Sequence, residues 1–137
     1  MSTTVTVNQL ASALIASFEG CRLTAYQDTG GVWTIGFGHT QDVAEGMTIT
    51  QDQADEFLIA DSAPLFKAVE SITSPLAAAA LVSFGYNVGI GKLEIVLAGH
   101  DFINSPRHWT DMHGNVLAGL KHRRNLEELL YTVGVGA

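Results

Sequence analysis

Cysteine and basic residues are scarce in this chain of 137 residues. The single cysteine, Cys21, excludes a disulfide bond within the chain and fits synthesis in a reducing compartment. Seven Lys and Arg residues stand against fourteen Asp and Glu residues, which gives a net charge of −7. Because phosphate groups and anionic lipid headgroups are bound by clustered Lys and Arg, we expect no nucleic-acid partner and no stable association with a membrane.

Long apolar runs are also missing. The N-terminus has no basic segment, and Ser12 and Ser17 interrupt the apolar stretch 11–18. A bilayer span needs about 20 apolar residues, so we expect neither a signal peptide nor a transmembrane segment. The sequence has no Cys and His cluster with zinc spacing and no glycine-rich phosphate loop, and we therefore expect no metal and no organic cofactor.

The chain does have a one-domain length and 47% hydrophobic residues, enough for a buried core. Helical spacing and capping signals predict a mostly helical α+β fold with one short extended region near the N-terminus. The predicted helices are residues 8–19, 50–69 with Pro64 inside, 75–87, 92–97, 101–104 and 116–131, followed by a loose tail. The helix 75–87 is apolar on nearly all sides, which indicates a buried core helix.

Two acids, Glu19 and Asp28, lie on different predicted elements. Gly20 ends the first helix at Glu19, beside an apolar neighbour and the negative end of the helix dipole. Asp28 opens an Asp-Thr-Gly-Gly turn, which is more solvated. If these contrasting carboxyls face one cleft, one can protonate a leaving oxygen while the other activates a water molecule. The ordinary alternative is a solvated surface Glu and an Asx turn.

Residues 32–40 alternate as in a β-strand. One predicted face is large and mostly apolar, with Trp33, Ile35, Phe37 and His39, and the other carries Thr34, Gly36 and Gly38. Because the second face has almost no side chains, we expect it to admit a bulky ligand close to the backbone.

Several motifs occur in a fixed order along the chain. Phe-Glu-Gly-Cys-Arg-Leu-Thr-Ala-Tyr, Asp28 and Val-Trp-Thr-Ile-Gly-Phe-Gly-His-Thr combine to give the spacing Glu-x8-Asp-x5-Thr. The later motifs are Gly-Met-Thr-Ile-Thr (46–50), Ala-Leu-Val-Ser-Phe-Gly-Tyr-Asn-Val-Gly (80–89) and Val-Leu-Ala-Gly-Leu-Lys-His-Arg-Arg-Asn-Leu-Glu (116–127). Over most of its length the chain thus resembles the phage-type lysozymes, the endolysins of glycoside hydrolase family 24.

The resemblance implies one lysozyme-like catalytic domain, residues 1–137, with two lobes and a cleft between them. A β-hairpin lobe covers about 20–50, a linking helix about 51–70, and a helical lobe about 71–131 together with the first helix. Glu19 would be the general acid, Asp28 would hold or deprotonate the attacking water, and Thr34 would orient it. The implied reaction is inverting hydrolysis of the peptidoglycan bond between N-acetylmuramic acid and N-acetylglucosamine.

Four further positions match the family less distinctively. His39 and Asp61 match a structural ion pair, while Tyr86 and Asn87 match positions that line the substrate cleft. The ordinary alternatives are two independent polar residues and a core tyrosine. Cys21 is expected to be a buried small hydrophobe rather than a redox switch.

Departures from the family pattern keep other functions open. The segment after Gly89 is shorter than in relatives, and the chain is acidic where many relatives are basic. The alternatives are a lytic transglycosylase that uses Glu19 alone and a non-catalytic cell-wall-binding or phage structural module. An endolysin would be a monomer made in the host cytoplasm. It would reach the periplasmic wall after a holin permeabilises the membrane, without binding the holin.

Overall fold

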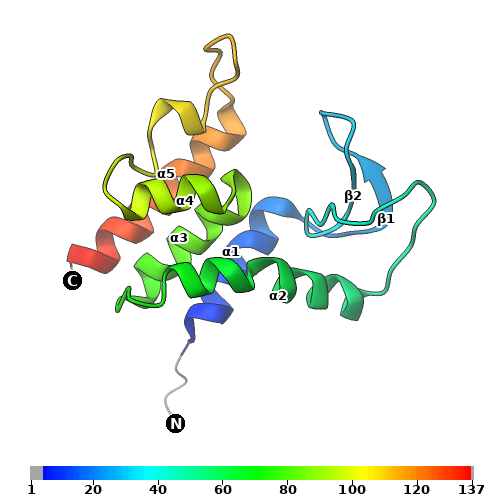
Figure 1. Cartoon of the computed structure of the whole chain (residues 1–137), viewed down its shortest axis with the longest axis horizontal. Coiled ribbons are helices and arrows are strands. Elements are labelled where there is room, and N and C mark those ends of the chain that lie inside the picture. Colours follow the sequence, from blue (N-terminus) through cyan, green and yellow to red (C-terminus); the bar gives the residue numbers. More distant parts are fainter. Residues whose placement is uncertain (1–4, 137) are drawn as a thin grey trace. The chain divides into compact units, whose positions relative to one another are not determined.

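The computed structural model of the chain describes residues 5–136 (Figure 1). In chain order its elements are α1 (Val7–Glu19), β1 (Arg22–Gln27), β2 (Trp33–Gly36), α2 (Gln51–Ala68), α3 (Pro75–Val88), α4 (Ile90–Leu97), the 3₁₀-helix η1 (Pro106–His108) and α5 (Ala118–Gly136). This content confirms the predicted mostly helical α+β class. Within the described part of the chain, no helix is long and apolar enough to cross a membrane.

The chain divides into two compact units. We call Ile15–Ala63 the hairpin unit, because it contains β1 and β2. The described residues up to Leu14 and those from Pro64 to Gly136 form the helical unit.

Helix α3 is the core of the helical unit. Its start is defined by Ser74, whose hydroxyl oxygen accepts a 3.3 Å hydrogen bond from the Ala77 N–H, and by Pro75 in the first turn. Residues 77–85 are all buried, and α3 packs against α4 and α5 (Figure 1). The prediction of a buried core helix is therefore confirmed.

The last helix is longer than predicted. Helix α5 continues to Gly136, so the expected loose tail after Tyr131 is wrong. A Cβ atom at Gly134 would lie only 2.7 Å from the Ala77 nitrogen, which shows how closely the end of α5 approaches the start of α3. Packing of this segment against α3 stabilises helix that its glycine-rich composition does not favour.

The connection after α3 also differs from the prediction. Helix α4 begins at Ile90 rather than at residue 92. The predicted helix 101–104 does not form: Phe102 O accepts a 3.1 Å bond from Ser105 N–H, and Pro106 then has no N–H to extend the turn. Pro106 instead begins η1.

In the hairpin unit, β1 and β2 pair antiparallel, with Tyr26 opposite Thr34 and a bulge between Arg22 and Tyr26. The predicted strand 32–40 is wrong beyond Gly36. Gly36 and Gly38 have φ values of +65° and +83°, which favour glycine and turn the chain. Ile35 and His39 consequently face each other and exchange two backbone hydrogen bonds of 2.8 and 2.9 Å.

The expected open face around Gly36 is also wrong. A Cβ atom at Gly36 would lie 3.5 Å from the Ala54 Cβ and 3.6 Å from the Ile49 Cδ1. Ile49 lies on a segment that joins the edge of β1, where its N–H donates to Leu23 O at 2.9 Å. The start of α2 and Ile49 therefore cover this position, and it is not open to a ligand.

Candidate active site

The Asp28 carboxylate is held by the backbone of its own turn. Its Oδ1 accepts hydrogen bonds from the Gly30 N–H at 2.8 Å and the Val32 N–H at 2.9 Å. The Asp28 N–H also donates to Val32 O at 2.9 Å. Because Oδ1 is occupied twice, Oδ2 is the oxygen that can act on a bound water. The Asx turn is thus present, and it orients the carboxylate.

Thr34 lies on β2 and bonds to Val32, the residue that also bonds to Asp28. Its hydroxyl donates to Val32 O at 2.9 Å, and the residue is 4% exposed. A hydroxyl has one proton, so the Thr34 oxygen can only accept any further hydrogen bond. Val32 therefore connects Asp28 and Thr34. Sequence reasoning missed this role because a backbone peptide leaves no residue-type signal.

Glu19 is the last residue of α1, as predicted. Gly20 follows with φ +65°, and its N–H still donates to Ala16 O at 3.0 Å. The left-handed conformation ends the helix and leads the chain into β1. Glu19, Asp28 and Thr34 all belong to the hairpin unit, each on a different element or turn.

His39 and Asp61 are brought together within the hairpin unit. Nδ1 of His39 lies 2.7 Å from Oδ2 of Asp61 on α2. The imidazole also stacks on Phe57, with ring centroids 4.0 Å apart and planes 5° apart. These contacts attach the turn that follows β2 to helix α2, so they hold the backbone that continues from Thr34.

Tyr86 and Asn87 lie in the last turn of α3, in the helical unit. Asn87 is exposed, and its Oδ1 accepts a 2.9 Å hydrogen bond from Nη1 of Arg124. Tyr86 is half-buried. The structure therefore connects Asn87 to Arg124 of α5.

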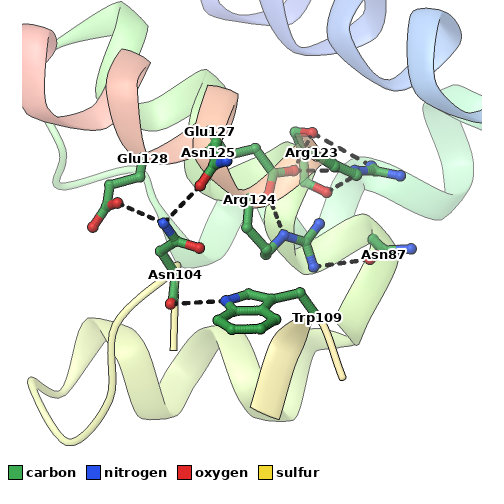
Figure 2. Close-up of polar contacts among 9 residues, drawn as sticks. Asn87, Asn104, Trp109, Arg123, Arg124, Asn125, Glu127 and Glu128 are labelled. Atoms are coloured by element: carbon green, nitrogen blue, oxygen red, sulfur yellow. Dashed lines mark hydrogen bonds and ion pairs between the residues drawn. The ribbon is translucent and has the colours of Figure 1, made fainter. Parts of the chain in front are cut away.

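Beneath Asn87 lies a buried charge cluster between α3 and α5, shown in Figure 2. Glu127 accepts from Ser83 Oγ at 2.6 Å, from Arg123 Nε at 3.1 Å and from Arg124 Nε at 2.6 Å. The side chains of Glu127 and Arg124 are 0% exposed. The i,i+3 and i,i+4 spacing of the three α5 residues is the signal that could have identified this cluster from sequence.

Cys21 does not match its expectation. It is exposed, with its Sγ 3.8 Å from Oε1 of Gln51, and not a buried hydrophobe. Among the described residues, no group of three or more His, Cys, Asp and Glu side chains could hold a metal ion.

The family model described as phage lysozyme matches residues 16–127, which include every candidate residue above. The chain belongs to the phage lysozyme family.

One relative of this phage lysozyme family member matches nearly all of its chain. The endolysin of Bacillus phage PZA is 35% identical over 144 residues, covering 93% of this chain and 55% of the relative. The chain thus spans just over half the length of that curated relative.

Two solved structures are similar over nearly their full length. The muramidase domain of SpmX from Asticaccaulis excentricus has a TM-score of 0.72 at 33% identity, covering 93% of this chain and 98% of that one. The endolysin from Escherichia coli O157:H7 phage FAHEc1 has a TM-score of 0.74 at 30% identity, with 96% of each chain covered. The resemblance to phage-type lysozymes and their fold is therefore confirmed.

A cavity of about 320 Å³ lies elsewhere in this phage lysozyme family member, in the helical unit. Its walls include Val96 of α4, Phe102, and Glu128 and Tyr131 of α5. None of the candidate site residues lines it.

A buried His–Asp pair supports the loop that follows α4. Nε2 of His108 donates to Oδ2 of Asp101 at 2.8 Å, with side-chain exposures of 1% and 6%. Within the described residues, Nδ1 of His108 is buried and has no hydrogen-bond partner. Burial therefore lowers the pKa of His108 below its usual 6.5, against the opposing effect of Asp101, and nearby Lys92 and Arg124 lower it further.

This pair makes the fold sensitive to mild acid. An unfolded histidine binds a proton below about pH 6.5, whereas folded His108 resists protonation, so the unfolded state takes up more protons in this window. The contribution of His108 to stability is complete above about pH 6.5 and is lost as the pH falls toward its folded pKa. Burial raises the pKa of Asp101, but bonds from Phe102 and His108 and the charge of Arg107 lower it overall. Its contribution is therefore lost only below its usual 3.8.

His108→Gln should flatten the decrease of the urea midpoint as the pH falls below about 6.5, because the amide can donate to Asp101 but does not titrate. His113→Gln is the matched control, since His113 is exposed, and it should retain the parental pH profile. Equal slopes for the parent and His108→Gln would contradict this explanation.

Proposed function

We propose that this chain is a muramidase that hydrolyses the β-1,4 bond between N-acetylmuramic acid and N-acetylglucosamine in peptidoglycan, and thereby lyses bacteria. The observation that carries the proposal is the arrangement around the Val32 peptide. These hydrogen bonds leave Asp28 Oδ2 and the Thr34 hydroxyl oxygen available as acceptors, on two residues that both bond to Val32. The relatives named endolysin and muramidase domain support the same activity and substrate.

In the proposed reaction, one water molecule donates one proton to Asp28 Oδ2 and the other to the Thr34 oxygen. A lone pair of this water then attacks the anomeric carbon while Glu19 donates its proton to the glycosidic oxygen of the departing sugar. Asp28 takes up the proton that the water loses. Attack opposite to the leaving group inverts the anomeric configuration, and inverting enzymes hold their carboxyls roughly 6.5–9.5 Å apart to admit the water.

The remaining site residues have supporting roles in this proposal. Tyr86 and Asn87 bind the polymer, and the ion pair of His39 with Asp61 keeps the turn after β2 on α2. No metal or cofactor takes part, and the described residues form one lysozyme-like catalytic domain.

The cellular setting that we propose is that of an endolysin. The protein is made in the host cytoplasm and acts as a monomer on the periplasmic wall after a holin permeabilises the membrane, without binding the holin, nucleic acid or lipid.

The chemistry of the products tests the proposal. Purified wall treated with the chain should yield fragments with reducing N-acetylmuramic acid ends, and proton NMR should detect the α-anomer first. Mass spectrometry separates this result from a lytic transglycosylase, whose anhydro ends are lighter by one water. Anhydro ends would overturn hydrolysis, and an initial β-anomer would overturn inversion. Wall binding without any new ends would favour the non-catalytic module.

A further inference from the structure

The orientation of the Asn87 amide is fixed by the chemistry of its neighbour. An arginine guanidinium carries only donors, so the Asn87 atom 2.9 Å from Arg124 Nη1 must be the oxygen. Figure 2 shows the Arg124 side chain between Glu127 and Asn87. The two ends of the amide are therefore distinguishable.

Arg124 is itself immobilised. Its Nε donates to Oε1 of Glu127 at 2.6 Å, and its guanidinium lies 5.1 Å from the centre of the Phe84 ring. With 0% exposure, the side chain has no room to turn with the ligand. The hydrogen bond to Asn87 thus connects a rigid buried cation to an exposed side chain.

The consequence concerns the outward end of Asn87. Since Oδ1 faces Arg124, the Nδ2 group and its two N–H donors point the other way, and within residues 5–136 no group accepts a hydrogen bond from them. An exposed amide that rotated freely could offer either a donor or an acceptor. Held in this orientation, Asn87 presents its two N–H donors outward.

We infer that Arg124 is a positioning residue and that Asn87 selects an acceptor oxygen, an amide carbonyl, on the bound polymer. The inference rests on the proposed function, which supplies the polymer. Peptidoglycan offers such carbonyls in its N-acetyl groups and in its peptide stems. A hydroxyl that acts only as a donor would gain nothing from this group.

The test uses a variant that loses the two outward N–H donors of Asn87 but keeps an oxygen that accepts from Arg124. Asn87→Asp retains an oxygen for Arg124 but presents an oxygen to the ligand. In a Glu19→Gln background, which prevents cleavage, we expect Kd for the polymer to rise about tenfold, since one hydrogen bond is lost and two acceptors oppose each other. In the active background we expect KM to rise about tenfold and kcat to stay within about twofold.

Two further variants separate binding from stability and charge. Asn87→Ala removes both ends, so we expect weakened binding and a lower melting temperature, whereas Asn87→Asp should melt at or above the parental temperature. Asn125→Asp adds the same charge to the same unit and keeps the oxygen that accepts from Asn104 at 2.9 Å. This control should bind the polymer like the parent.

The ligands identify the source of the carbonyl. An N-acetylglucosamine hexamer contains N-acetyl groups only, while a peptide-bearing wall fragment contains both kinds. Weakening by Asn87→Asp on both ligands assigns the N-acetyl group, and weakening on the fragment alone assigns the stem.

Other outcomes overturn the inference. Parental binding by Asn87→Asp would show that no ligand acceptor depends on the Asn87 amide, and tighter binding would show that the ligand atom is a donor. Equal weakening by Asn125→Asp would reduce the effect to charge. If Asn87→Asp melted at a temperature as low as that of Asn87→Ala, the hydrogen bond to Arg124 would not position this side chain. If the parent bound neither ligand, Asn87 would not belong to a binding site. A parent that binds but never cleaves overturns only the proposed function.

Discussion

Glu19→Gln is expected to lower the rate of wall hydrolysis about 10²- to 10⁴-fold, the usual contribution of a general acid. Glutamine has nearly the shape of glutamate but no proton to donate to the glycosidic oxygen, so the bond would have to break with a poor leaving group. The measurement is the loss of turbidity of chloroform-treated Gram-negative cells, together with the release of reducing ends from purified wall.

The control for this variant lies in the same unit. Glu45 is exposed in the loop between β2 and α2, and Glu45→Gln makes the same change of charge away from the candidate acid. It should lyse cells at the parental rate. Equal lysis by the parent and Glu19→Gln would remove Glu19 from the mechanism, and no lysis by either would favour a binding module.

Among the variants proposed, Glu127→Gln is expected to be the least stable, with a free energy of unfolding about 3–5 kcal/mol below that of the parent. Glu127 is the carboxylate to which Arg123, Arg124 and Ser83 all donate, and its side chain is 0% exposed. Removing its charge leaves two buried guanidinium groups facing an amide, one half of which is itself a donor. Urea denaturation followed by circular dichroism measures the loss.

The neighbouring acid provides a matched comparison. Glu128 is half-buried on the same helix and accepts one hydrogen bond, from Asn104 Nδ2 at 2.9 Å (Figure 2). The carbonyl oxygen of a glutamine can accept that bond, so Glu128→Gln should cost no more than about 1 kcal/mol. A loss of similar size in both variants would show that the Glu127 cluster is not a special contributor to stability.

Local signals predicted the parts of the fold that depend on a few adjacent residues. Gly20 ends α1 at Glu19 because one residue in the left-handed conformation is enough to end a helix, and glycine adopts that conformation readily. The Asp-Thr-Gly-Gly turn at Asp28 forms through its own backbone amides. Ser74 and Pro75 start α3, and its continuous apolar composition predicts burial. The family was also recognisable from its motifs, since their order along the chain does not depend on folding details.

The predictions that failed concern contacts between distant residues. Alternation extended the strand to residue 40, but Gly36 and Gly38 turn the chain so that α2 can pack at Ala54. The end of α5 is helical because it packs against α3, and composition alone favours a loose tail there.

The candidate site divides in the same way. Residue types and spacing nominated Glu19 and Asp28, the family resemblance added Thr34, and the catalytic roles of all three stay predictions until the variants are measured. Tertiary structure alone revealed that Arg124 orients the amide of Asn87. The physical reason is that a hydrogen bond depends on where two groups meet in space, and residues 37 positions apart in the chain carry no local mark of that meeting.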